Sequence, residues 1–188
     1  MTAATSDGGA DTAALSSPAT QPRPGAAPDR GPTAQPISVL APVPGRAVPL
    51  AQVPDPVFAQ AMVGPGAAID PPRGIVNAVA PLDGVLLKVF PHAFVIAADA
   101  GVGVLVHLGL DTVQLDGEHF TVHVRQGERV RAGDTVTTWD TAAVAASGRD
   151  PIVPVVALDV DPSAVRVADA VGTGSDLGPG DVLLTVTR

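Results

Sequence analysis

A repeated pattern of glycine-punctuated apolar segments constrains the fold of this chain more than any other feature. The segment Ala41-Pro42-Val43-Pro44-Gly45-Arg46-Ala47-Val48 is echoed by Ala80-Pro81-Leu82-Asp83-Gly84-Val85-Leu86-Leu87, and in each copy an Ala-Pro entry leads through Gly into an apolar run. Residues 124–134 and 171–181 form a second pair, with equally spaced glycines and a Gly-Asp ending. Such glycines suit turns with positive φ. The repeats predict an all-β fold, an antiparallel β-sandwich or flattened barrel built by duplication.

The composition agrees with many short strands separated by turns. The 188 residues include 20 Gly and 20 Pro, and 46% are hydrophobic but only 3% aromatic, so we expect an aliphatic core. Residues 1–36 consist largely of Ala, Pro, Ser, Thr, Gly and Asp, which predicts a disordered tail with little to bury. Residues 37–188 are expected to form one domain.

Helices are expected to be short. Asp55-Pro56 supplies an N-cap and a first-turn proline for a helix over 57–63, which Gly64-Pro65 would end. Asp140 can cap a helix over 141–147, with Gly148 at the C′ position. Asp161-Pro162 is typical of a third short helical turn.

Charge and cysteine content exclude several classes of function. The formal net charge of −8 disfavours nucleic acid and anionic membranes as partners and suits a basic protein partner. The absence of Cys excludes disulfides, zinc-thiolate sites and thiol catalysis. We find no signal-peptide pattern and no apolar run near the roughly 20 residues that span a bilayer, so a cytoplasmic protein without direct membrane insertion is expected.

Two histidines, His92 and His107, flank a glycine-rich turn within strand-like sequence. If the segment forms a hairpin, a two-residue loop at Asp99-Ala100 sets the histidines directly opposite each other. A four-residue loop over 99–102 sets them one diagonal apart on the same face. An odd loop would need a bulge at Gly101 or Gly103. The pattern therefore predicts that the two imidazoles meet across adjacent strands.

Three chemistries could use such a pair. The first is zinc binding by His92 and His107, with Asp111 as a third ligand. Lysostaphin-like zinc peptidases use His-x-x-x-Asp with a later His-x-His, and this chain has no His-x-His. The second is general acid/base hydrolysis, for which no serine outside the tail has a nucleophile-elbow context. The third is nucleophilic catalysis by imidazole, which needs neither metal nor serine.

The remaining candidate groups have plainer interpretations. His119 and His123 would share a strand face but stand roughly 13 Å apart, and we interpret them as surface residues. The single lysine, Lys88, lies within the apolar run 85–90, which disfavours a lipoyl- or biotinyl-type carrier domain with its lysine at a hairpin tip.

From about Val39 to Arg188 the chain resembles the enzyme IIA component, glucose type, of the phosphoenolpyruvate-dependent sugar phosphotransferase system. The combination of His-Ala-Phe at 92–94 with His-x-Gly-Leu-Asp-Thr at 107–112 is highly specific for that family. Further matching stretches are 53–58, 62–66, 80–84, 106–113, 115–118 and 130–134. The tail lies outside the match. The resemblance implies a β-sandwich of the duplicated hybrid motif type.

The resemblance also implies roles for individual residues. His107 matches the phosphoryl acceptor, which takes the group on Nε2, and His92 matches the histidine that hydrogen-bonds the phosphate. The carbonyl of Gly109 would hold the Nδ1–H of His107. The positions implied to contact partner proteins are Asp55 and Asp111, facing basic residues of the donor, and Phe58, Phe90, Leu105 and Val113 in an apolar rim. Family members often carry a threonine shortly before the first histidine, whereas this chain has Phe90-Pro91-His92.

The function implied by the resemblance is that of a phosphocarrier. Its phosphoryl donor would be the histidine-containing protein HPr, and its acceptor a cysteine of an enzyme IIB domain in a permease for a sugar of the glucose or N-acetylglucosamine class. No cofactor would be required. The alternatives are a regulatory binding module that switches with phosphorylation and contacts other target proteins, and a zinc-dependent hydrolase on a related β scaffold.

Overall fold

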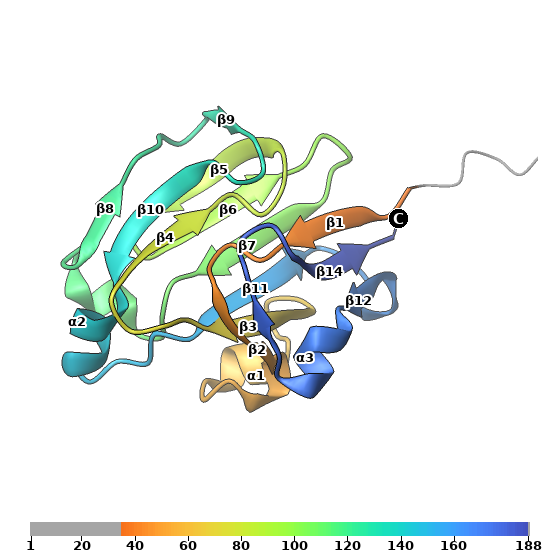
Figure 1. Ribbon diagram of the computed structural model, residues 1–188. Helices are drawn as coiled ribbons and strands as arrows, with labels where there is room; N and C mark the ends of the chain where they lie inside the picture. The colour runs from red at the N-terminus through yellow and green to blue at the C-terminus, as the bar shows by residue number, and fades with distance from the viewer. Residues whose placement is uncertain (1–34, 188) are drawn as a thin grey trace, which may run out of the picture. The chain divides into compact units, whose positions relative to one another are not determined.

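The structure is a computed structural model that describes residues 35–187, and these residues fold mainly into antiparallel strands (Figure 1). One sheet has eight strands in the order β13-β2-β3-β11-β7-β6-β5-β9, and two three-stranded sheets have the orders β1-β14-β12 and β4-β10-β8. The strands span Ile37–Leu40 (β1), Gly45–Pro49 (β2), Gly66–Asp70 (β3), Ile75–Val79 (β4), Gly84–Phe90 (β5), Ala93–Ala97 (β6), Gly103–His107 (β7), Phe120–Val122 (β8), Arg129–Val130 (β9), Thr135–Asp140 (β10), Val153–Leu158 (β11), Val165–Val167 (β12), Asp176–Leu177 (β13) and Val182–Val186 (β14). The predicted all-β fold is confirmed, and within 35–187 the sheets do not close into a barrel.

The strand order of the sheets has the same twofold repeat as the sequence. Each Ala-Pro copy joins a strand of a small sheet to one of the large sheet, β1 to β2 in the first copy and β4 to β5 in the second. The two copies also bond to each other reciprocally. Equivalent backbone bonds of 2.8 Å run from Leu40 N to Pro81 O and from Val79 N to Pro42 O. Each copy also bonds one segment of the second repeated pair in the same way, from Ala47 N to Ser175 O and from Leu86 N to Glu128 O, both 2.9 Å. The large sheet therefore has matching halves that meet at the β11–β7 pair.

The core is aliphatic, as the composition predicts. The larger cluster lies between the sheets and includes Phe94, Leu86, Ile96 and many valines. Trp139, the only tryptophan of the chain, is also buried there, and its ring stacks on that of Phe120 at 5.5 Å. A second cluster on the opposite face of the large sheet contains Val48, Leu50, Val53, Phe58, Ala68, Leu110, Ile152 and Val156.

The three predicted helix starts, at Asp55, Asp140 and Asp161, are confirmed by side-chain capping bonds. The short helical elements are Leu50–Gln52 (η1), Pro56–Ala59 (α1), Thr112–Leu115 (η2), Thr141–Ala146 (α2), Pro162–Ala164 (η3) and Asp169–Thr173 (α3). The carboxylates of Asp55 and Asp140 each accept two backbone N–H bonds at the start of α1 and α2. The first helix ends at Ala59, short of the predicted Val63, because Ala61 takes a left-handed φ of 50°. The sequence did not predict η1, η2 or α3.

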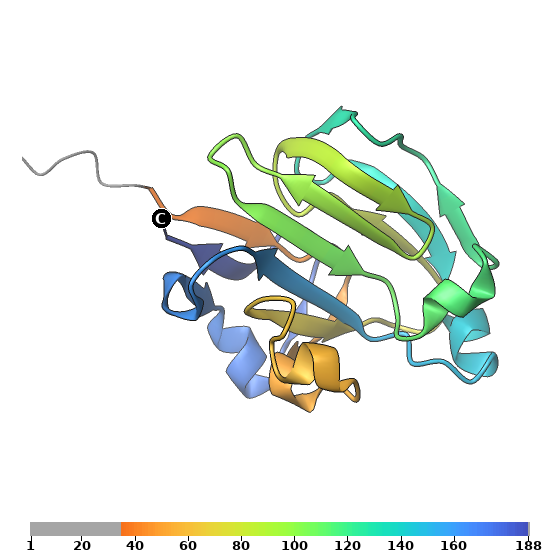
Figure 2. The same ribbon diagram turned by 180° about the vertical axis from the view of Figure 1, so that it is seen from behind.

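The two halves of the large sheet differ in one connection. Strands β5 and β6 are joined by the two residues Pro91 and His92, with Phe90 paired to Ala93. The equivalent strands β2 and β3 are joined by the segment 50–65, which contains η1 and α1 and packs in the second cluster (Figure 2). This asymmetry brings residues of both connections to the end of β7.

The predicted tail, residues 1–36, falls almost wholly outside the described residues. Among residues 35–187, no helix is long and apolar enough to cross a membrane.

Candidate functional site

His107 is the last residue of β7 and is held by the backbone that follows it. Its Nδ1 lies 2.6 Å from the carbonyl oxygen of Gly109. Gly109 has a φ of +79°, and a Cβ there would lie 2.6 Å from Thr112 Cγ2 and 3.0 Å from Asp150 O. Only glycine fits this turn without strain. The sequence at 109 therefore fixes the carbonyl that orients the ring.

His92 reaches His107 from the turn between β5 and β6. The two imidazole centroids are 5.3 Å apart, and the ring of Phe90 stacks on His92 at 5.9 Å. The backbone of the turn is tied to the end of β7, because Leu108 N donates to His92 O at 2.7 Å. The rings therefore meet as the sequence predicts.

The loop between β6 and β7 has an odd number of residues, but the bulge expected with such a loop is absent, because the pairing runs without a register shift from Ala93–His107 to Ala97–Gly103. Ala98 N bonds Val102 O, which leaves a loop of Asp99, Ala100 and Gly101. Gly101 has a φ of +79°, as expected of the last residue of a three-residue hairpin loop. Ala93 then pairs with His107, so His92 is not opposite His107 in either predicted way. The rings meet because His92 lies in the turn between β5 and β6, just before the residue that pairs with His107.

The electrostatics of the pair favour neutral imidazoles. Burial lowers the pKa of His107, and the Gly109 carbonyl together with the charges of Asp55 and Asp111 offsets part of this effect. Burial also lowers the pKa of His92, and the nearby His107 lowers it further. Because the Gly109 carbonyl can only accept, Nδ1 of His107 carries the proton and Nε2 keeps its lone pair. The arrangement thus presents a nucleophilic nitrogen.

The residues expected in the rim occupy different depths. Phe58 is only 8% exposed, and its ring meets that of His107 edge-on at 5.5 Å, so it forms a wall of the site rather than an outer surface. Phe90 and Val113 are 51% and 58% exposed, and Leu105 is half-buried. The structure thus offers two exposed apolar side chains at this surface.

The two predicted acidic residues lie on either side of the pair in sequence. Asp55 caps α1 with its Oδ1, 2.8 Å from Val57 N and 3.3 Å from Phe58 N. Asp111 is exposed and has a left-handed φ of 56°. Both are near enough to raise the pKa of His107 in part.

Several site residues were not singled out from the sequence. Thr112 is fully buried, and its hydroxyl donates to Leu108 O at 2.8 Å, which closes the turn after His107. Its place in the His-x-Gly-Leu-Asp-Thr motif was a usable signal. Met62, 70% exposed, and Val57 add apolar surface beside α1. Arg149, far away in sequence, contacts the turn at Asp111.

The zinc alternative lacks a ligand set. Within residues 35–187, no three His, Asp or Glu side chains are grouped so that they could hold a metal ion. Nδ1 of His107 is already engaged with Gly109. The pair therefore leaves at most two ring nitrogens for a metal, fewer than the three protein ligands of catalytic zinc sites.

The remaining histidines, His119 and His123, do not lie on one strand. His119 and His123 flank β8, so the predicted i, i+4 spacing on one strand is wrong. His119 is partly buried with a left-handed φ of 75°, and His123 is exposed with Nε2 2.8 Å from Thr138 Oγ1. Lys88 is exposed within β5, in mid-strand as predicted.

Residues 37–162 match the family described as phosphoenolpyruvate-dependent sugar phosphotransferase system, EIIA 1. The chain belongs to this family. The glucose-specific EIIA component of Oceanobacillus iheyensis is 42% identical over 127 residues, covering 66% of this chain and 76% of the relative. The glucose-specific EIICBA component of Streptococcus pneumoniae is 47% identical over 133 residues, covering 70% of this chain but 18% of the relative. Glucose permease IIA from Mycoplasma capricolum superposes with a TM-score of 0.72 at 35% identity, covering 80% of this chain and 96% of that one.

Membership of the EIIA family sets the general activity. The chain is a phosphotransferase component of sugar transport, in which it carries phosphoryl groups, and its fold is that of the IIA glucose permease. The chain spans 76% of the length of the Oceanobacillus EIIA protein but only 18% of the length of the Streptococcus EIICBA protein.

Proposed function

We propose that Nε2 of His107 accepts a phosphoryl group from phospho-HPr and passes it to a cysteine of an enzyme IIB domain. The convergence of the two imidazoles, with Nδ1 of His107 held at 2.6 Å by the Gly109 carbonyl, carries this proposal. In the first step the P–N bond of the donor breaks as the bond from phosphorus to Nε2 forms. In the second step that bond breaks as a P–S bond forms to the cysteine thiolate. The Nδ1 proton remains on His107 throughout.

His92 is proposed to hold the transferring group without carrying it. Its ring centroid lies 5.3 Å from that of His107, close enough for an N–H of His92 to reach the oxygens of a phosphoryl group on Nε2 of His107. A neutral imidazole has one N–H, which can donate to a phosphoryl oxygen. Donors placed where charge develops stabilise the transition state of such transfers.

The surface around the pair suits two partners that dock in turn. Phe90, which stacks on His92, and Val113, on η2 shortly after His107 in the chain, are both exposed, and apolar groups of a partner packed on them would exclude water from the transferring group. Asp55 and Asp111 add negative charge that would steer a basic donor. Since one surface serves donor and acceptor in succession, each complex is expected to be weak and short-lived. The exposed Phe90 and Val113 with the half-buried Leu105 are proposed as the docking surface, and the buried Phe58 as the wall of the site behind them.

The wider setting follows from the relatives. The Streptococcus pneumoniae EIICBA component and the mannose-specific EIIBCA component of Corynebacterium glutamicum combine further components with the part that matches this chain. We infer a cytoplasmic carrier domain over 37–188 that serves a permease for a sugar of the glucose or N-acetylglucosamine class. Transfer between imidazole and thiolate would need no zinc or other cofactor.

Phosphorylation with phosphoenolpyruvate, enzyme I and HPr tests the proposal. The full-length chain should acquire acid-labile label, and His107→Gln should acquire none. His123→Gln, an exposed histidine outside the pair, is the matched control and should label normally. Label persisting on His107→Gln would disprove the role of His107.

A regulatory role is a second candidate. Because the exposed Phe90 stacks on His92, a dianionic phosphoryl group on the adjacent His107 would change the surface offered to other proteins. Affinity capture with phosphorylated and unphosphorylated chain would test this idea. Identical sets of bound proteins would exclude a switch.

A further inference from the structure

The short helix η2, which follows His107, is weakly held by its own caps. Asp111, at its N-cap, has a φ of 56° and makes no side-chain capping bond, and Asp116 at its C-cap has a φ of 49°. Between them, η2 carries Val113, whose side chain is largely exposed at the proposed docking surface. The buried Thr112 anchors the start of η2 through its bond to Leu108 O, and contacts from residues outside η2 add to what fixes the rest of the turn.

Arg149, in the loop after α2, supplies such a contact. Its Nη2 donates to Gln114 Oε1 at 3.0 Å, and its Nε makes a longer contact of 3.4 Å with Asp111 O. Its Nη1 donates to Ser147 O at 2.9 Å, which anchors the guanidinium to its own loop. One planar group thus links the α2–β11 loop to both ends of the turn over 111–114.

The same loop also supports the residues between His107 and η2. Leu110 N donates to Asp150 O at 2.7 Å. Figure 2 shows the segment after β7 lying beside the α2 segment at one end of the sheets. The backbone bond fixes the turn near Gly109, while the guanidinium reaches farther along the chain to Gln114.

We propose that Arg149 is a positioning residue for partner docking: its guanidinium holds η2 so that Asp111 and Val113 stay in place beside His107. The inference rests on the proposed function. The acceptors of Arg149 are neutral oxygens, and within residues 35–187 no carboxylate lies at ion-pair distance from it. The turn is therefore held by the planar arrangement of N–H donors on the guanidinium and not by its positive charge.

Transfer rates measured over a range of phospho-HPr concentrations test this inference. Arg149→Ala should raise the KM for the donor about tenfold while kcat stays within about twofold, since the docking surface and not the reacting nitrogen is disturbed. A purely structural loss would instead reduce the active fraction, lowering the apparent kcat at an unchanged KM. Arg149→Lys keeps the charge but not the fork and should also show a raised KM. An unchanged KM in Arg149→Ala, or full restoration by lysine, would overturn the proposal.

A second variant keeps the test valid if Arg149→Ala folds poorly. Gln114→Ala removes one acceptor from an exposed position, so it should raise the KM in the same direction. Adding it to Arg149→Ala should raise the KM no further, because the two residues act through one bond. If the effects of the two substitutions on the donor KM were fully additive, or if Gln114→Ala had a normal KM, the proposed role of the bond between Arg149 and Gln114 would be contradicted.

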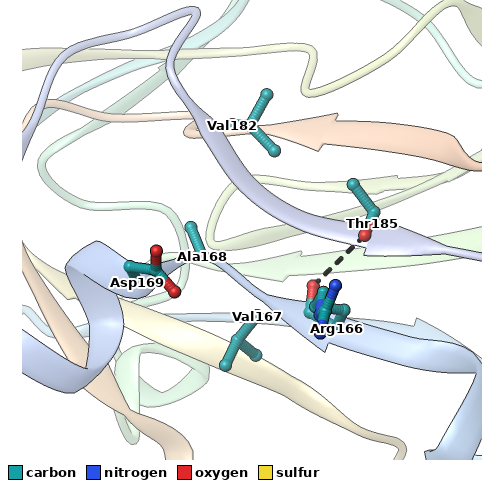
Figure 3. A pocket seen from close by; sticks show the side chains of 6 residues that line it. All are labelled: Arg166, Val167, Ala168, Asp169, Val182 and Thr185. Atoms are coloured by element: carbon teal, nitrogen blue, oxygen red, sulfur yellow. Dashed lines mark hydrogen bonds between the residues drawn. The ribbon is translucent and has the colours of Figure 1, made fainter.

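Arg166 provides the matched control. It lies on β12 beside a shallow pocket of about 410 Å³ with Asp169, Val182 and Thr185 (Figure 3), and Figure 1 places β12 and α2 at opposite ends of the sheets. Arg166→Ala should leave the donor KM and kcat unchanged. Labelling of His107→Gln would defeat the proposed function itself, whereas a normal KM in Arg149→Ala beside unlabelled His107→Gln would defeat only the positioning role.

Discussion

The carbonyl oxygen of Gly109 lies 2.6 Å from Nδ1 of His107, and because a carbonyl only accepts, this contact fixes the tautomer of the ring. The lone pair is thereby left on Nε2, the nitrogen that faces away from the backbone contact. The geometry of two residues in one short turn thus selects which nitrogen can act as the nucleophile.

Gly109→Ala should disturb this contact and the fold together. The new Cβ would lie 2.6 Å from Thr112 Cγ2, and the residue would keep a φ of +79°, so we expect the free energy of unfolding to fall by about 1–3 kcal/mol. The phosphorylation rate of the folded fraction should fall as well, because the carbonyl that orients the ring moves. Thermal unfolding and initial transfer rates measure the two effects. A variant with normal stability and normal rates would contradict the account of this turn.

The pH dependence of transfer should follow the lowered pKa of His107. Acceptance needs the neutral ring, so the rate should fall with acid only below the ordinary histidine pKa of roughly 6.5. Asp111→Asn removes a charge that raises this pKa, so its acid limb should shift to lower pH. NMR titration of the imidazole measures the shift directly. Asp169→Asn, on α3, serves as the control, and a shift to higher pH in Asp111→Asn would refute the electrostatic assignment.

The same lowered pKa affects stability. Between the pKa of the folded protein and that of the unfolded chain, the unfolded chain binds more protons, so the free energy of unfolding should increase with pH in that window. Denaturant unfolding of His107→Gln beside the unaltered chain isolates this contribution. If both proteins show the same pH dependence through the window, the group responsible is not His107.

His92→Gln should still accept a phosphoryl group but pass it on poorly. The transfer step to the IIB cysteine should slow by about 10²-fold or more, the size typical of losing one donor to a transition-state charge. Single-turnover transfer from the isolated phosphorylated variant measures this step apart from loading. Onward transfer at the normal rate would remove His92 from the mechanism.

Thr137→Val should leave the protein at least as stable as before. Thr137 Oγ1 and Trp139 Nε1 are buried on β10 without a hydrogen-bond partner among the described residues. Replacing the hydroxyl by a methyl group removes a buried polar atom and keeps the side-chain shape, so the free energy of unfolding should rise by about 1 kcal/mol or stay unchanged. The fluorescence of Trp139, the only tryptophan in a chain without tyrosine, reports the unfolding. A loss above about 2 kcal/mol would mean that the hydroxyl has a partner.

Local signals in the sequence predicted the elements whose causes are themselves local. Asp55 and Asp140 cap their helices because a carboxylate next to a helix start bonds the nearest free N–H groups. The repeated Gly-Asp segments predicted the duplication, because the equivalent glycines Gly127 and Gly174, and likewise Gly133 and Gly180, all take positive φ. The hairpin pattern predicted that His92 and His107 meet, but it did not predict that His92 lies in the turn between β5 and β6.

The features that the sequence did not predict depend on contacts between distant segments. The loop at 99–101 could close in several ways, and only the paired strands show that Ala93, not His92, faces His107. Phe58 is buried because the segment 50–65 folds back over the sheet, which no periodicity reveals. Arg149 joins η2 through a loop that is remote in the chain, so neither its composition nor its spacing marks it.

The unequal connections in the two halves of the large sheet bear on stoichiometry. Where one half offers the corner built by Pro91 and His92, its counterpart is filled by the segment 50–65, which sends Phe58 against His107 instead of forming a corner of its own. The duplicated fold therefore has a single phosphorylation site, and each molecule should hold one equivalent of phosphorus at saturation.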